Sequence, residues 1–244
     1  MNTAWLRWHV LEDPEAVAHA VARRILRAAE RAQEDRGRFR IVLAGGTTPR
    51  RTYQILARAQ SDWSRWAVYF GDERCLPREH PERNSRMAAE AWLDHVPIPA
   101  THIHPIPAEL GPLEAAHRYA AVVAQAVPFD LVLLGVGEDG HTASLFPGQE
   151  HDPEEWVHAV FDAPKPPPER VTLSVRALSA AHEAHALVTG PSKCGAVHRW
   201  RTGEDLPIAR VRSHTGLDAW LDRAADACGY TAHPSTESPG SERS

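Results

Sequence analysis

The glycine-rich segment at residues 135–148, GVGEDGHTASLFPG, combines a flexible backbone with two side chains that could do acid/base chemistry. Its first three glycines fit the G-x-G-x-x-G pattern of dinucleotide-binding loops, but His141 follows them directly. A histidine has an unperturbed pKa of about 6.5 and can act as a general base at neutral pH, and Asp139 is near enough to orient its ring. The segment therefore has two interpretations, a nucleotide cradle or a turn that presents a base.

The residues that follow favour the turn. A dinucleotide fold needs a long helix after the third glycine and an acidic residue about 20 positions further on, a place that Asp162 could fill. Pro147 and Gly148 interrupt the chain soon after His141, so that helix would be too short. We therefore predict a sharp turn from which His141 projects as a general base, oriented by Asp139. A histidine that is hydrogen-bonded only for structure is the alternative.

A second glycine pair lies in residues 45–49, GGTTP, between an apolar segment and a helical pattern. The glycines let the backbone approach a ligand, Thr48 can cap the helix, and Pro49 suits its first turn. Amide N–H groups at the positive end of a helix suit an anion such as phosphate. No Gly-Lys-Ser/Thr follows, so this is not a P-loop, and a tight turn without a ligand is the alternative. The predicted substrate-binding residues here are Gly45, Gly46, Thr47 and Thr48.

Charged side chains follow two further apolar segments. Asp72, Glu73 and Arg74 follow WAVYF at residues 66–70 after a single glycine. Arg74 could clamp a phosphate bidentately, and an acid beside it could orient a sugar hydroxyl or the arginine; a surface ion-pair cluster is the alternative. Lys193 follows AHALVTG and suits an anion-binding amine, or else a solvated surface lysine. Together these loops hold what a sugar-phosphate enzyme without a metal or redox cofactor needs.

The elements that must position these loops alternate along the chain. FDLVLLG at 129–135 is a continuous apolar run, which is typical of a strand buried on both faces of a parallel sheet. The order predicts an α/β fold, doubly wound, with a mainly parallel sheet and helices on both faces (Rossmann-like), in which ligands bind beyond the carboxyl ends of the strands. We expect one domain over 1–228 and a flexible tail over 229–244. Helical patterns are expected over 13–36, 48–59, 85–94, 112–127, after 191, and 217–227. Apolar strand-like segments are expected over 39–44, 66–70, 129–135, 157–162, 170–176 and 184–190, and a short apolar segment lies at 206–211.

Composition excludes several classes of protein. The 244 residues carry a formal net charge of −5 and no run of Lys or Arg, so we expect no nucleic-acid and no membrane partner. We find no secretory signal and no unbroken apolar stretch of the roughly 18 residues that a membrane span needs, so a cytoplasmic location is predicted. Three widely spaced cysteines predict reduced thiols that pack rather than react. His102 with His104 and His182 with His185 lack an evident third ligand, so no metal is expected.

The loops, in this order and spacing, resemble the 6-phosphogluconolactonases, within the wider group that includes the glucosamine-6-phosphate deaminases. The likeness covers about residues 40–200, and GEDGHTASLFPG is its most specific segment, whereas GGTTP and the Lys193 segment are shared across the group. The matching segments are LAGGTTPRRTY, VYFGDERCLPREHPERNSRM, FDLVLLGVGEDGHTASLFPG, RVTLS and VTGPSKCGAV.

The resemblance implies hydrolysis of 6-phosphoglucono-δ-lactone to 6-phosphogluconate, with a phosphorylated sugar lactone as the small-molecule partner and no cofactor. By analogy His141 would activate water, the phosphate would lie near GGTTP, Arg74 and Lys193, and Asp72 and Asn84 would lie in or beside the pocket. A deaminase would need a further carboxylate where this chain reads TASLFPG. A non-catalytic sugar-phosphate sensor on the same fold is the other alternative, and it would not need the base. The oligomeric state is left open by the sequence.

Overall fold

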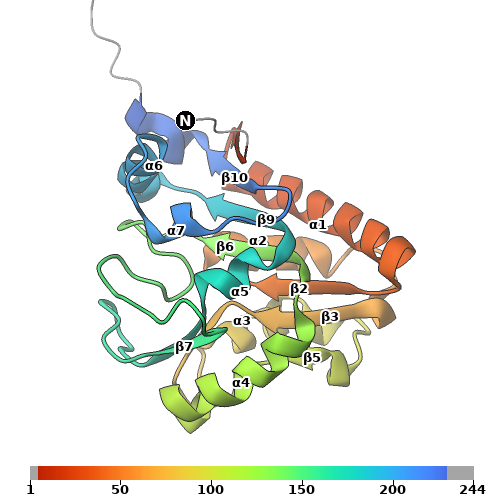
Figure 1. Cartoon of the computed structure of the whole chain (residues 1–244). Coiled ribbons are helices and arrows are strands. Elements are labelled where there is room, and N and C mark those ends of the chain that lie inside the picture. The colour runs from red at the N-terminus through yellow and green to blue at the C-terminus, as the bar shows by residue number, and fades with distance from the viewer. Residues whose placement is uncertain (1–4, 230–244) are drawn as a thin grey trace, which may run out of the picture.

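The computed structural model describes residues 5–229, and its central element is a seven-stranded parallel sheet with the strand order β1-β10-β9-β6-β2-β3-β5 (Figure 1). A second sheet, β4-β8-β7, is antiparallel and lies beside the carboxyl end of β3. The strands are β1 Leu6–Leu11, β2 Phe39–Leu43, β3 Trp66–Phe70, β4 Asp72–Arg74, β5 Ile103–His104, β6 Phe129–Gly135, β7 Val157–Val160, β8 Arg170–Leu173, β9 Ala181–Val188 and β10 Leu217–Asp222.

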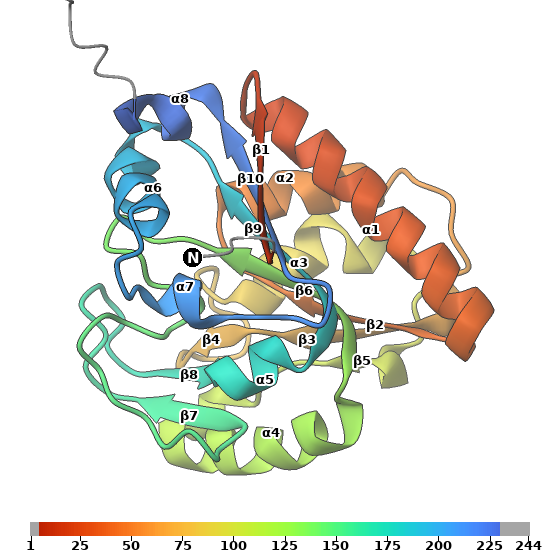
Figure 2. The same ribbon diagram turned by 45° about the horizontal axis from the view of Figure 1, so that its top comes forward.

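Helices cover both faces of the large sheet, which confirms the predicted doubly wound α/β class. α1, α2 and α3 lie on one face, and α4 to α7 lie on the other with the small sheet (Figure 2). This division follows from right-handed crossovers that run in opposite directions along the sheet. The helices are α1 Pro14–Arg36, α2 Thr47–Leu56, α3 Asn84–Ala91, α4 Pro112–Ala126, α5 Val175–Ser179, α6 Cys194–Arg201, α7 Pro207–Arg210 and α8 Arg223–Asp226.

The longest helix, α1, begins and ends where its sequence indicates. Asp13 accepts a hydrogen bond from the backbone N–H of Ala16 (2.8 Å) and Pro14 occupies the first turn. Gly37 ends the helix in the left-handed conformation, with φ of 75°. The apolar stripe of α1 is buried against the sheet. The sequence prediction for this element is confirmed.

The expected helix over 217–227 is wrong, because residues 217–222 form strand β10 and only Arg223–Asp226 are helical. Leu217, Ala219 and Leu221 are fully buried, and they alternate with Asp218, Trp220 and Asp222. β10 pairs with β1 on one side and β9 on the other, so tertiary neighbours satisfy its backbone. The segment 170–176 also differs from expectation: the strand ends at Leu173.

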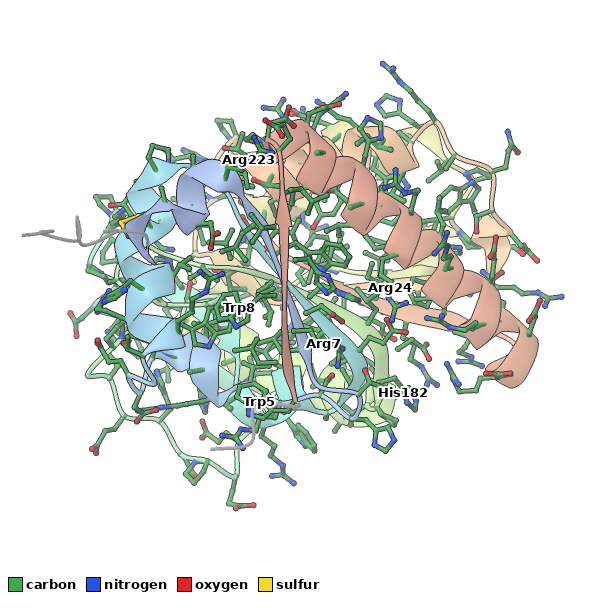
Figure 3. The ribbon with its side chains drawn as sticks, turned by 90° about the horizontal axis from the view of Figure 1, so that it is seen from above. Trp5, Arg7, Trp8, Arg24, His182 and Arg223 are labelled. Carbon is green, nitrogen blue, oxygen red and sulfur yellow. A yellow bond between two sulfur atoms is a disulfide. The ribbon has the colours of Figure 1, made fainter. Side chains whose placement is uncertain are left out.

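The cysteine prediction also needs correction. Cys194 and Cys228 form a disulfide, with their Cα atoms 5.2 Å apart, which is visible as the yellow bond in Figure 3. The two residues are 34 positions apart and meet because α6 packs against the turn that follows α8. Only Cys75 is free among the described residues. The predicted tail, apart from Gly229, lies outside the residues that the structure describes.

Edge strand β1, which the sequence analysis did not predict, joins the sheet through side chains on both of its faces. Trp8 packs edge-on against Trp200 of α6, with ring centroids 4.8 Å apart. Arg7 points to the other side of the strand (Figure 3) and forms a bidentate pair with Asp218 of β10, at 2.8 and 2.7 Å. Alternation along the strand thus places one anchor on each face.

Candidate active site

The main cationic cleft lies at the point where the chain reverses its direction along the sheet. β2 and β6 are neighbours, and the connections after them lead to opposite edges. The loops that follow the two strands diverge there, and the cleft between them has a volume of about 320 Å³. Open α/β sheets bind ligands at such a switch point, beyond the carboxyl ends of the strands. Leu43 at the end of β2, Gly45 beyond it, and residues 133–137 at and just beyond the end of β6 line the cleft.

The turn after β6 is as sharp as its glycines predict. The backbone N–H of Gly137 donates to the carbonyl of His141 (2.8 Å), and the N–H of Gly140 donates to the carbonyl of Gly137 (3.0 Å). Gly140 has φ of 87°, which a residue with a side chain rarely adopts. No helix forms between β6 and β7 in the described chain, so the dinucleotide interpretation is wrong. The turn instead brings His141 to the wall of the cleft.

Asp139 holds the imidazole of His141 in one orientation. Its Oδ1 lies 2.5 Å from Nδ1 of the ring and accepts the backbone N–H of His141 at 3.1 Å. Burial raises the pKa of Asp139, but the backbone N–H and the ring of His141 outweigh it, so the net pKa lies below the ordinary value. An ionised carboxylate only accepts hydrogen bonds, so Nδ1 carries the proton and Nε2 keeps its lone pair. That nitrogen makes no hydrogen bond with any described residue and can accept a proton.

Asp72 and Glu73 are buried, so the alternative of a surface ion-pair cluster is wrong. Asp72 accepts hydrogen bonds from Asn84 Nδ2 (3.0 Å) and from Ser144 Oγ (2.7 Å), and with Asn84 it lines the cleft. Glu73 points away and accepts the backbone N–H groups of Asn84 and Ser85, both at 2.8 Å. The first carboxylate therefore faces the ligand space, whereas the second fixes the start of α3.

Two of the cations in the cleft are those that the sequence predicts. Arg74 and Lys193 both line it, and Lys193 forms no ion pair in the described part of the chain. Burial lowers the pKa of Lys193. Arg74 Nη1 donates to the carbonyl of Glu82 (2.5 Å), while its Nε is buried without a hydrogen-bond partner among residues 5–229. Both groups can still bind an anion.

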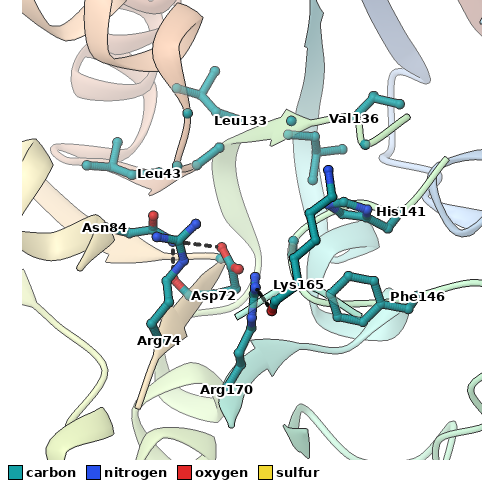
Figure 4. Close-up of a pocket in the computed structure, with 18 of the residues that line it drawn as sticks. Leu43, Asp72, Arg74, Asn84, Leu133, Val136, His141, Phe146, Lys165 and Arg170 are labelled. Atoms are coloured by element: carbon teal, nitrogen blue, oxygen red, sulfur yellow. Dashed lines mark hydrogen bonds between the residues drawn. The ribbon is translucent and has the colours of Figure 1, made fainter. Parts of the chain in front are cut away.

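The cleft also holds two cations, Arg170 and Lys165, that the sequence analysis did not identify. Arg170 of β8 lies opposite Arg74 of β4 in the antiparallel register, so both side chains are on one face of the small sheet. Arg170 donates from Nε to the carbonyl of Pro167 (3.0 Å) and from Nη2 to that of Lys165 (2.8 Å), and burial lowers its pKa. Lys165 extends across the cleft toward His141 (Figure 4), with Nζ 4.0 Å from Glu138.

Some sequence signal for these cations existed. Arg170 opens RVTLS, a segment that matched the resembling family, and Lys165 opens the stiff KPPPE loop. Neither segment stands next to the glycine loops in sequence. Their approach depends on the antiparallel pairing of β4 with β8, which no local pattern predicts.

The GGTTP loop contributes its backbone but not its hydroxyls. Gly45 and Gly46 line the cleft, and α2 begins at Thr47 with Gly46 in the capping position. The expected cap by Thr48 is wrong: its hydroxyl lies 2.5 Å from that of Thr189 and is buried. Thr47 is exposed, and neither threonine lines the cleft.

Other candidate chemical groups do not gather at the cleft. Within residues 5–229 no three His, Cys, Asp or Glu side chains are arranged to hold a metal ion. His185 is buried, and its ring accepts from Trp220 Nε1 (3.0 Å). Burial raises the pKa of the Cys75 thiol to about 12, which disfavours a thiolate nucleophile. No helix in the described chain combines the length and the apolar character of a membrane span.

Fold and cleft together define an α/β protein with a cationic cleft, suited to a small anionic ligand, and a histidine at the cleft wall. A family model described as glucosamine-6-phosphate isomerases/6-phosphogluconolactonase matches residues 12–220. The chain belongs to this family. It is 39% identical to a 6-phosphogluconolactonase of Streptomyces coelicolor, over 88% of this chain and 92% of that protein. It is 36% identical to a 6-phosphogluconolactonase of Rattus norvegicus, over 88% of this chain and 91% of the relative.

Solved structures give the same fold. The crystal structure of a 6-phosphogluconolactonase from Thermotoga maritima superposes with a TM-score of 0.84 at 28% identity, covering 89% of this chain and all of that one. A monomeric glucosamine-6-phosphate deaminase superposes with a TM-score of 0.81 at 20% identity, which shows only that the fold is shared. Fold alone therefore does not separate the two activities.

Proposed function

We propose that the protein hydrolyses 6-phosphoglucono-δ-lactone to 6-phosphogluconate, a step of the oxidative pentose phosphate pathway. The observation that carries this proposal is the His141–Asp139 pair at the cleft wall, with Nδ1 held at 2.5 Å and Nε2 free. The relatives named as 6-phosphogluconolactonases, at 36–39% identity, support the same reaction. The cleft carries the cations that a phosphorylated substrate needs.

In the proposed reaction, His141 Nε2 takes a proton from water as the water oxygen attacks C1 of the lactone. The bond between C1 and the ring oxygen then breaks, and the imidazolium returns the proton to that oxygen. The products are a carboxylic acid and a hydroxyl group, so the step needs no oxidant, metal or cofactor. Asp139 keeps the ring in the productive tautomer and stabilises its positive charge.

The phosphate of the substrate acts as the handle that fixes C1 beside His141. Arg74 and Arg170 project from paired strands, and a planar guanidinium binds phosphate bidentately. Lys165 and Lys193 add positive charge at the same cleft. Asp72 and Asn84, held to each other at 3.0 Å, offer acceptors and a donor to the sugar hydroxyls. Binding energy from these groups serves orientation.

Steady-state kinetics of lactone opening, corrected for the spontaneous background and run with a chelator, test this proposal. We expect His141→Ala to lower kcat by about 10²- to 10⁴-fold with little change in KM, because general base catalysis contributes a rate enhancement of that size. Asp139→Asn should lower kcat less, and Arg74→Ala should mainly raise KM. A His141→Ala enzyme with near-normal turnover would remove the proposed base.

The same assay separates the alternatives. A sensor would bind the substrate without accelerating lactone opening, and a deaminase would release ammonia from glucosamine-6-phosphate.

We propose a cytoplasmic location and no nucleic-acid or membrane partner, consistent with the net charge of −5. Relatives from rice are named as chloroplastic, so fractionation of the native host is the relevant measurement.

A further inference from the structure

A second cavity, of about 570 Å³, lies toward the amino ends of β2, β3 and β5 and is closed on one side by α4. It shares no lining residue with the proposed active site, which lies at the opposite, carboxyl edge of the sheet. Its volume is in the range of about 300–1,000 Å³ that is usual for small-molecule sites. Nothing in the proposed reaction uses it.

The charged side chains around this cavity are basic. Arg38, Arg40 and Arg65 line it, whereas no Asp or Glu does so in the described chain. Arg65 is paired with Asp62 at 3.0 Å, but the guanidinium groups of Arg38 and Arg40 form no ion pair within residues 5–229. Asp130 is the nearest buried acid on β6, and it is already engaged by the guanidinium of Arg36 (2.7 Å) and by the backbone N–H of Arg40 (2.7 Å).

Tyr69 of β3 also lines this cavity. Its side chain is only 7% exposed, yet its hydroxyl makes no hydrogen bond with any residue of the described chain. The ring stacks on His104, with centroids 4.7 Å apart and planes at 15°. Burial raises the pKa of Tyr69, against the lowering effect of Arg40 and Arg38, so the hydroxyl stays protonated and can donate at neutral pH. Because it has no partner within residues 5–229, the hydroxyl can bond to a ligand that enters the cavity.

The remaining walls divide into a polar and an apolar part. Ala121, Val122 and Ala126 of α4 give a smooth apolar surface, and Gln125 of the same helix adds an amide. His104 has a pKa lowered by burial and by the charge of His102, so its ring is neutral at pH 7 and can donate or accept. A ligand with an anionic end and a less polar body matches this division.

We propose that this cavity is a second ligand site, which binds a phosphorylated small molecule through Arg38, Arg40 and the Tyr69 hydroxyl. Two guanidinium groups without carboxylate partners match the charge of a phosphate dianion, and the tyrosine donates a further hydrogen bond to it. The apolar part of α4 would contact the body of the ligand. The site is independent of the lactone chemistry, because it shares no side chain with the catalytic cleft.

Calorimetric titration with inorganic pyrophosphate tests the proposal on the whole protein. We expect the wild type to bind at two sites, because the catalytic cleft is also cationic, and Arg38→Gln/Arg40→Gln to lose one of them with at least tenfold weaker binding. Tyr69→Phe should weaken the same event by roughly 3- to 10-fold, the effect of one hydrogen bond. Arg23→Gln/Arg27→Gln is the matched control, since it removes two exposed arginines of α1 that form no ion pair in the described chain.

The outcome does not depend on the lactonase proposal. Turnover of the lactone should be unchanged in Arg38→Gln/Arg40→Gln, and binding should be intact in His141→Ala. Identical titrations of the wild type and Arg38→Gln/Arg40→Gln would overturn the second site. An equal loss in the control pair would show that pyrophosphate responds only to net charge, and would overturn it too.

Discussion

At the scale of single residues, the candidate site depends on how closely a backbone approaches an imidazole. The Nδ1 atom of His141 lies against Asp139 on one side and against Gly137 on the other. A Cβ atom at position 137 would overlap with the His141 ring and with the Asp139 carboxylate. The absence of a side chain at residue 137 is therefore a condition for the orientation of the His141 ring.

Gly137→Ala should consequently lower kcat of lactone hydrolysis by about 10²-fold, because a displacement of about 1 Å of a catalytic group has an effect of that order. The measurement is steady-state kinetics together with thermal denaturation. Gly195→Ala in α6 is the control, since a Cβ there meets nothing within 4 Å. Unchanged kcat in Gly137→Ala would show that the ring position does not limit the reaction.

At the scale of elements, Glu73 joins strand β4 to helix α3. It is fully buried and accepts four hydrogen bonds, from the backbone N–H of Arg74, Asn84 and Ser85 and from the Ser85 hydroxyl, at 2.7–2.9 Å. Its charge also lies 3.3 Å from the buried Arg83 guanidinium. A carboxylate at this position satisfies amide groups that a helix N-terminus leaves without partners. The contact thereby fixes Asn84 at the cleft.

Glu73→Gln keeps the shape but places an amide donor against other donors. We expect a loss of about 2–4 kcal/mol in the free energy of unfolding, as for a buried charged network that loses one partner. KM should rise more than kcat falls, because Asn84 moves and His141 does not. Urea denaturation and kinetics measure both effects. Glu79→Gln on the exposed loop serves as the control, and a Glu73→Gln protein of wild-type stability would contradict the capping role.

At the scale of the whole molecule, edge strand β1 is attached to the sheet by a buried carboxylate. Asp218 of β10 accepts from Arg7 at 2.8 and 2.7 Å and lies 2.7 Å from His9 Nε2. Burial raises the pKa of Asp218, but the hydrogen bonds from Arg7 and His9 and the charge of Arg7 outweigh it and lower the pKa to about 2. The ordinary value is 3.8. The folded state therefore holds the ionised form more tightly than the unfolded chain does.

The contribution of Asp218 to the free energy of unfolding depends on pH. Because the folded pKa is depressed, this stabilisation is complete above about pH 5 and is lost as the pH falls through 4 toward 2. At pH 7 it is about 2 kcal/mol, from a shift of nearly two pKa units. Urea denaturation of Asp218→Asn and the wild type at pH 7, 5 and 3 should show a difference that shrinks with acidity. Asp162→Asn is the control, because Asp162 is exposed and its carboxylate forms no ion pair within residues 5–229. A difference that is constant with pH would assign the effect to packing instead.

The sequence by itself determined the alternation of elements, the boundaries of α1 and the sharp turn at His141. These features are local. A capping aspartate, a terminal glycine and a short distance to Pro147 act within a few residues, so their physical consequences can be read without the rest of the chain. The continuous apolar run of β6 similarly determined that the sheet is parallel and covered on both faces.

Tertiary structure alone decided the features that depend on contacts between distant parts of the chain. Residues 217–222 became a strand because β1 and β9 offer hydrogen-bond partners on both sides, which outweighs the helical tendency of the segment. Arg170 reaches the cleft, and Cys194 reaches Cys228, only after distant segments pack together. The same holds for the cavity that Arg38, Arg40 and Tyr69 line, because a cavity forms only when the elements around it pack. Contacts between residues far apart in sequence depend on the packing of whole elements, and that information is not present in any short stretch of residues.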